Sequence, residues 1–200
     1  MRQQIKSNML FFILPFIMLV HVVPASAQTP TSVLPGAGRP VAIGATSARR
    51  SHLMDRIERG VIAVPAAGMR DIEVIVVQDN DFRQDDYFFY LTGLETPDAW
   101  LVMAVGEDER QTILFLPERN PDREHWTGIR LGPGPDAASL SGIDETVLLD
   151  SLDAYLRRLR RANRGPLYTL LYGPAERHDR ITDWVFAGID VRNVTPVLDS

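Results

Sequence analysis

Residues 100–116 read WLVMAVGEDERQTILFL, two apolar runs with a polar segment between them. The runs Trp100–Val105 and Thr112–Leu116 are rich in branched and aromatic residues, and Gly106–Asp108 separates them. Runs of this length that are bounded by turn residues are typical of buried β-strands. We therefore predict that they are neighbouring strands of one sheet, and that the aromatic run Tyr87–Leu91 is a third strand.

The segment toward the N-terminus predicts a helix followed by a short strand. Ser47–Arg59 has the apolar spacing of a helix face, with Thr46 or Ser47 as its cap and Gly60 as its end. Val61–Val64 is a short apolar run that Pro65 stops, as expected of a buried strand.

The C-terminal half alternates between helical and strand patterns. Ser151–Asn163 predicts the clearest helix, because apolar residues recur at helical spacing at Leu152, Tyr155, Leu156 and Leu159. Leu167–Tyr172 predicts a strand and Asp179–Ala187 a further helix, while Asp71–Gln78 is an additional extended candidate. Strands and helices interleave, so we predict an α/β fold in which helices cover both faces of a mixed sheet.

The N-terminus has the three-part layout of a secretory signal peptide. Arg2 and Lys6 precede the apolar run Met9–Val23, and the small residues Ala25–Ala27 follow it. The alternative is a membrane anchor, but the apolar run is short for a full span. We predict a signal peptide over residues 1–27, a flexible linker over 28–46 and a domain over 47–200. The protein would then be periplasmic or secreted after cleavage near Ala27.

Composition and motifs exclude several kinds of site. The formal net charge of −5 argues against a general nucleic-acid binder, and the absence of cysteine excludes disulfides and thiolate metal ligands. The sequence contains no H-E-x-x-H pair, no Walker loop and no nucleophile elbow. Four aspartates gather near residue 80, but their spacing fits no calcium loop, and a solvated connection explains them better. They are Asp79, Asp81, Asp85 and Asp86.

Two long motifs carry a resemblance to a known family. Residues 82–99 read FRQDDYFFYLTGLETPDA, and residues 124–132 contain the pattern Glu-x-Trp-x-Gly-x-Arg-x-Gly. In order and separation they resemble the N-terminal domain of aminopeptidase P (Xaa-Pro aminopeptidase), a relative of creatinase and prolidase. Arg49-Arg50 and Gly60–Ala63 fit the same family, so the resemblance spans roughly residues 47–198. Tyr87 departs from it, because the family usually has an acidic or small polar residue there.

The resemblance implies a mixed α/β fold of the creatinase N-terminal type. It also implies a non-catalytic role for this domain. In this family, two metal ions, usually manganese, activate a hydroxide in a separate C-terminal "pita-bread" domain. The ligands of those ions, two Asp, one His and two Glu, lie beyond the matched region. We therefore assign no catalytic residue and no metal ligand to this chain.

The family role of such a domain is to wall the active-site cleft and to build oligomers. Trp126, in the second motif, is the candidate for contact with a proline-containing substrate, because a large aromatic on a loop suits an apolar ring. The alternative is that Trp126 and Arg130 only brace their own loop. We predict that the aromatic residues Phe88, Phe89, Tyr90 and Trp100 belong to the core.

Two classes of function remain open. The chain is either the non-catalytic domain of an Xaa-Pro aminopeptidase, inactive alone, or a free-standing exported binding or scaffold module derived from that domain. In the first case its partners are a catalytic domain in the same or a neighbouring chain, Xaa-Pro peptides through the parent enzyme, and further copies in a homo-oligomer. Nucleic acid is not an expected partner.

Overall fold

A computed structural model describes residues 41–68, 82–107, 110–127, 129–162, 165–172 and 175–200. The predicted signal peptide, most of the predicted linker and the segment Asp71–Gln78 lie outside these ranges. In the described part of the chain, no helix is long and apolar enough to cross a membrane.

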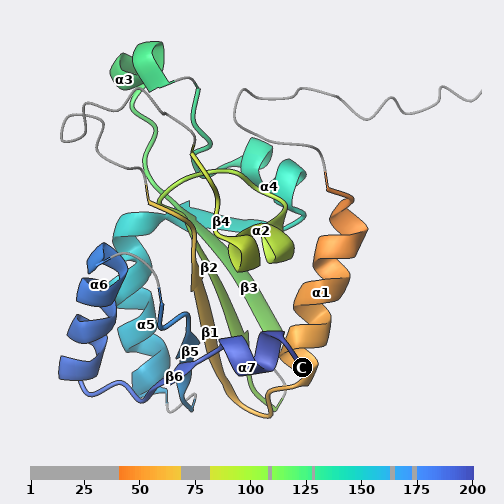
Figure 1. The fold of residues 1–200 in the computed structure, drawn as a ribbon, viewed down its shortest axis with the longest axis vertical. Helices are drawn as coiled ribbons and strands as arrows, with labels where there is room; N and C mark the ends of the chain where they lie inside the picture. Colours follow the sequence, from red (N-terminus) through yellow and green to blue (C-terminus); the bar gives the residue numbers. More distant parts are fainter. Residues whose placement is uncertain (1–40, 69–81, 108–109, 128, 163–164, 173–174) are drawn as a thin grey trace, which may run out of the picture. The chain divides into compact units, whose positions relative to one another are not determined.

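The described strands form one mixed sheet (Figure 1). Their order across the sheet is β4-β3-β2-β1-β5-β6. Antiparallel pairs join β1 to β2 and β2 to β3, whereas β3–β4, β1–β5 and β5–β6 are parallel. Their bounds are β1 (Gly60–Pro65), β2 (Trp100–Val105), β3 (Arg110–Leu116), β4 (Glu145–Leu148), β5 (Leu167–Thr169) and β6 (Val191–Asn193).

Helices cover both faces of this sheet (Figure 1). Helices α1 (Ile43–Asp55), α2 (Asp86–Thr92) and α4 (Pro135–Ser141) pack on one face. Helices α5 (Leu152–Arg161) and α6 (Ala175–Phe186) pack on the other. The short elements that complete the described fold are α3 (Pro121–Thr127), a 3-10 turn (Leu149–Ser151) and α7 (Thr195–Leu198).

The burial of the central strand β2 explains why its sequence is apolar along its whole length. All six of its residues are buried, and successive side chains point to opposite faces. Leu101, Met103 and Val105 join the core beneath α1 and α2, and the alternate residues of the strand join the core beneath α5 and α6. A strand buried on both faces is apolar throughout, since neither face meets water.

The predicted α/β fold with a mixed sheet between helices is confirmed. The predicted strand Trp100–Val105 matches β2, and the predicted strands around residues 61–64 and 112–116 match β1 and β3. The strand predicted over Leu167–Tyr172 is shorter, because β5 ends at Thr169. Helices α5 and α6 correspond to the two helices predicted in the C-terminal half, and α6 begins earlier than predicted, at Ala175.

Two local predictions are wrong. Tyr87–Leu91 is not a strand but lies in helix α2. Helix α1 begins at Ile43, earlier than the predicted Ser47, and Thr46 does not cap it. Thr46 lies inside the first turns, and its hydroxyl donates a hydrogen bond to the carbonyl of Ile43 instead. The predicted core is also only partly right, since Tyr90 is 46% exposed and Phe89 is only half-buried, whereas Phe88 and Trp100 are buried.

Candidate functional site

Helix α2 is built by the first half of the motif over residues 82–99. Asp85 caps its N-terminus, because Oδ1 accepts hydrogen bonds from the backbone N–H groups of Tyr87 at 3.0 Å and Phe88 at 3.1 Å. Asp86 begins the helix and pairs with Arg83 at the surface. Of the two described members of the acidic patch, Asp85 therefore caps a helix and Asp86 lies in an exposed ion pair.

Gln84 ties this motif together from a buried position. Its Oε1 accepts from the N–H of Ala67 at 2.6 Å and from that of Asp85 at 2.8 Å, and its Nε2 donates to the carbonyl of Thr96 at 2.8 Å. One buried amide thereby joins the end of the β1 segment, the start of α2 and the turn before β2. Gln84 belongs to the motif over residues 82–99, but its role in linking three segments can be seen only in the tertiary structure.

The Thr-Gly pair of the motif ends α2. Thr92 Oγ1 donates to the carbonyl of Phe88 at 2.7 Å and accepts from the N–H of Leu94 at 3.1 Å. Gly93 follows in the left-handed conformation, with φ of 71°, and its N–H donates to the carbonyl of Phe89. A left-handed glycine directly after the last helical residue is a common helix terminator.

The Arg-Arg pair of α1 contacts the end of α2. Arg50 is 4% exposed and donates to the carbonyls of Leu91 at 2.8 Å, Ser141 at 3.4 Å and Gly142 at 3.1 Å, so it links α1 to α2 and α4. Burial lowers the pKa of its guanidinium. Arg49 donates to the carbonyl of Tyr90 at 3.0 Å, and its guanidinium lies 4.3 Å from the centre of the Tyr90 ring.

Tyr87, the position that departs from the family pattern, connects α2 to the end of the chain. Its hydroxyl donates to Asp199 Oδ1 at 2.7 Å, and its ring centre lies 6.2 Å from that of Tyr172. This hydrogen bond to Asp199, with smaller contributions from burial and neighbouring carboxylates, raises the pKa of Tyr87. A smaller polar side chain at this position would not span the same distance.

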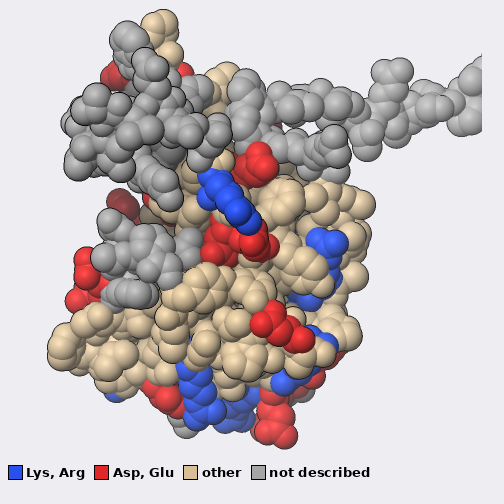
Figure 2. Space-filling model, viewed as in Figure 1, with Lys and Arg blue, Asp and Glu red and all other residues tan. Residues whose placement is uncertain are grey.

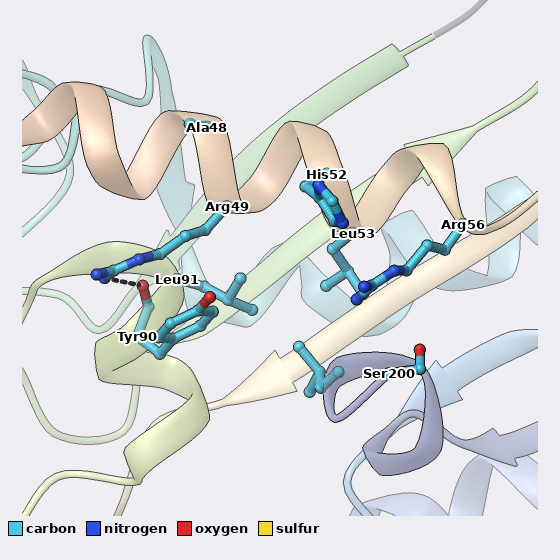
Figure 3. A pocket seen from close by; sticks show the side chains of 9 residues that line it. Ala48, Arg49, His52, Leu53, Arg56, Tyr90, Leu91 and Ser200 are labelled. Carbon is cyan, nitrogen blue, oxygen red and sulfur yellow. Dashed lines mark hydrogen bonds between the residues drawn. The ribbon is translucent and has the colours of Figure 1, made fainter.

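A pocket of about 360 Å³ lies between α1, α2 and α7 (Figure 3). The side chains from α1 form one wall, and those from α2 face them across the opening (Figure 3). Arg56 Nη1 donates to the carbonyl of Val197 at 3.2 Å, which holds α7 beside α1. The lining residues are Ala48, Arg49, His52, Leu53, Arg56, Tyr90, Leu91, Leu198 and Ser200.

The second motif is organised around Glu124 in α3. Its carboxylate accepts from Arg119 Nε at 2.8 Å and Nη2 at 2.6 Å, and from the N–H of Arg130 at 3.2 Å. The hydrogen bonds and charge of Arg119, together with the Arg130 N–H, hold the pKa of Glu124 below its usual value. The glutamate of the motif therefore closes the loop between β3 and α4.

The predicted substrate contact Trp126 lies on α3, two residues beyond Glu124. Its side chain lies outside the described part of the structure, so its contact with a substrate stays a prediction. The structure does not bring Trp126 and the pocket residues into one described site. The pocket itself was not predicted, since it depends on three elements that are far apart in the sequence.

Among the described residues, no group of three or more His, Cys, Asp or Glu side chains lies close enough together to hold a metal ion. Asp79 and Asp81 lie outside the described ranges.

Comparisons with known proteins agree on one family. Residues 46–168 match the model of the aminopeptidase P N-terminal domain. The "Probable Xaa-Pro aminopeptidase pepP" of Penicillium rubens is 34% identical over 136 residues, which cover 68% of this chain and 28% of the relative. Xaa-Pro aminopeptidase 3 of Mus musculus is 37% identical over 83 residues, 40% of this chain and 16% of that protein. The chain thus spans well under a third of either relative.

Solved structures show the same fold. Aminopeptidase PepP of Pseudomonas aeruginosa is 30% identical, with a TM-score of 0.60 over 74% of this chain and 33% of that one. Aminopeptidase P of E. coli, solved with the inhibitor Pro-Leu, has a TM-score of 0.62 at 20% identity and covers 79% of this chain and 38% of that one.

Proposed function

Because the chain belongs to the aminopeptidase P N-terminal domain family, we propose that it acts as the non-catalytic domain of an Xaa-Pro aminopeptidase and is inactive alone. One observation supports this above all: the family match fills most of the chain, whereas the chain covers only 33% of the solved Pseudomonas aeruginosa enzyme. In this proposal, hydrolysis of the bond before proline takes place in a catalytic half that is either a neighbouring chain or a continuation of this one.

Manganese belongs to that catalytic half in the proposal. The support is the resemblance, which implies that the two ions and their ligands lie in a separate C-terminal domain. Once bound there, they would supply the activated hydroxide. The contribution of the present chain would be to wall the cleft and to support oligomers.

Trp126 is the residue that we propose for contact with substrate across the cleft. The support is its position on α3, whose loop is closed by Glu124 and the guanidinium of Arg119. In a reconstituted enzyme, Trp126→Ala is expected to raise KM for an Xaa-Pro peptide about tenfold while kcat changes little, as expected when a contact made equally in the ground state and the transition state is lost. A variant with unchanged KM would assign Trp126 to bracing its own loop.

Export is part of the same proposal and rests on residues 1–27. Expression of the full chain in a Gram-negative host should give a periplasmic protein whose mass corresponds to cleavage after Ala27. A cytoplasmic, full-length product would contradict this step without affecting the family assignment.

The test of the central proposal is an activity assay of the purified chain with added manganese and an Xaa-Pro peptide. The chain is assayed alone and together with a separately expressed catalytic half whose fold and metal content have been verified. Turnover only with the partner is the expected result. Turnover by the chain alone would overturn the proposal, and silence in both mixtures would favour a free-standing binding module.

A further inference from the structure

The C-terminal ends of helices α5 and α6 meet and form one continuous surface. Arg160 of α5 donates a hydrogen bond from Nη1 to the carbonyl of Ala187, directly after α6, at 2.7 Å. Leu159 of α5 and Trp184 of α6 belong to the same buried core. We call this surface the α5–α6 end, and its members are Arg157, Arg160, Arg161, Val185 and Phe186.

The apolar part of the α5–α6 end projects into solvent. Phe186 is 85% exposed and Val185 is 53% exposed, which makes them the most exposed large hydrophobic residues in the described part of the chain. Figure 2 shows an uncharged area over the lower part of α6, with basic side chains gathered beside it at the lower end of the view. A large apolar side chain this exposed gains free energy wherever a partner removes it from water.

The basic part of the α5–α6 end is a stripe of arginines. Arg157, Arg160 and Arg161 are spaced three and four residues apart, so they lie on one face of α5, and all three are exposed. Among the described residues, no carboxylate lies within ion-pair distance of these three guanidiniums, whereas Arg110 and Arg192 do have such partners. A guanidinium has five N–H donors, so the single carbonyl contact of Arg160 leaves most of its donors available.

The positive charge is local, because the formal net charge of the whole chain is −5. Two carboxylates lie close to this surface in the sequence. Asp190 pairs with Arg192, and Asp183 is exposed one turn before Phe186 on α6. Salt screens charges beyond about 8 Å at physiological ionic strength, so acidic residues elsewhere in the chain weaken the field of the arginines very little at contact distance.

We propose that the α5–α6 end docks on an anionic lipid membrane, with Phe186 inserted below the headgroups and the arginines bound to lipid phosphates. Basic side chains beside exposed aromatic ones are typical of protein surfaces that lie on membranes. Guanidiniums bind phosphates through paired, charge-assisted hydrogen bonds, and each basic side chain near an anionic leaflet adds to the attraction. This docking goes beyond the proposed function and does not require a catalytic half.

A bilayer suits this surface better than a folded protein or a nucleic acid does. A phenyl ring that projects from the surface needs a preformed pocket in a folded partner, whereas acyl chains can close around it. Nucleic acid offers phosphates but no apolar layer beneath them for Phe186. A leaflet of anionic lipid offers phosphates at its surface and hydrocarbon below, which matches the arginines and the adjoining apolar tip of α6.

The test measures binding of the full chain to lipid vesicles by co-sedimentation. Vesicles of equal parts phosphatidylglycerol and phosphatidylcholine should bind it much more tightly than vesicles of phosphatidylcholine alone. The variant Arg157→Ala/Arg161→Ala should raise Kd for the anionic vesicles about tenfold, and Phe186→Ser should also raise it about tenfold. Each variant has the same N-terminus as the unaltered chain, so a difference in Kd reports on the α5–α6 end.

Matched variants on the opposite face of the sheet provide the controls. Arg49→Ala/Arg83→Ala removes the same charge, and Tyr90→Ser removes an aromatic side chain that is 46% exposed. Both should leave Kd unchanged. Asp183→Asn removes a negative charge one turn from Phe186 and should lower Kd about threefold, a gain that a folding defect would not produce. Circular dichroism of every variant checks that the domain remains folded.

The other outcomes would each overturn the membrane docking. No binding of the unaltered chain to the anionic vesicles would do so, and so would equal Kd values for the arginine variant and the unaltered chain. Weaker binding by the arginine variant without any loss in Phe186→Ser would make the stripe a general site for polyanions. None of these results affects the proposed function, which the aminopeptidase assay tests separately.

Discussion

Single side chains hold the helices of this domain to one another, and Arg50 is the clearest case. Its buried guanidinium donates to carbonyls at Leu91, Ser141 and Gly142. Arg50→Ala should lower the free energy of unfolding by about 2–3 kcal/mol, because buried acceptors lose their donor. Urea denaturation followed by circular dichroism measures this. Arg157→Ala, at an exposed position on α5, is the matched control and should change stability by less than about 0.5 kcal/mol.

Glu124 gives a pH-dependent prediction at the same scale. Its pKa is lower in the folded state, so its contribution to stability is present above the ordinary glutamate value of 4.5 and is lost as pH falls through the folded pKa. The Tm of the wild-type chain should therefore exceed that of Glu124→Gln by a constant amount between pH 6 and 8. This difference in Tm should shrink as the pH falls below 4.5, the ordinary pKa of glutamate. A difference that stays constant down to pH 3 would contradict this assignment.

Helix α2 is an element whose type the sequence pattern predicts wrongly. Tyr87–Leu91 has the aromatic composition of a strand, yet Asp85 caps a helix there and Gly93 ends it. Local capping and tertiary burial therefore outweigh the intrinsic strand preference of aromatic residues. The cap can be tested directly.

Removing the Asp85 cap should weaken α2. Asp85→Ala is expected to cost about 1 kcal/mol, because the N–H groups of Tyr87 and Phe88 lose their acceptor. Thermal unfolding provides the measurement. Asp86→Ala, which removes only an exposed pair with Arg83, should cost much less. Equal losses for the two variants would mean that Asp85 does not act as a cap.

The elements that could be predicted are those whose burial leaves a regular pattern in the sequence. β2 is apolar along its whole length because both of its faces are buried. In α5, apolar and polar residues alternate at helical spacing because one face of the helix is solvated. The strand β4 was missed, since Glu145 and Leu148 are both exposed and leave no period-two pattern. The candidate site was missed for another reason: its residues converge only when α1, α2 and α7 pack together.

At the scale of the whole domain, the two cores share one sheet and should unfold together. Met103 lies on the face beneath α1 and α2, whereas on the other face Trp100 of β2 packs against Trp184 of α6. In a Trp126→Phe background, Met103→Ala should cost about 2–5 kcal/mol. The unfolding midpoint followed by tryptophan fluorescence and the one followed by far-ultraviolet circular dichroism should shift to the same new value. Separate midpoints would show that the two layers unfold independently.

The edge strands of the sheet affect how this domain behaves when it is separated from a catalytic half. The outermost strands β4 and β6 are short, and each carries a charged side chain, Glu145 on one and Arg192 on the other. Short edge strands that carry charged side chains offer little template for pairing with the strands of another molecule. Self-association of the isolated domain would instead begin at exposed apolar side chains. Phe186, 85% exposed at the end of α6, is the first residue to replace by a polar one if the purified domain precipitates.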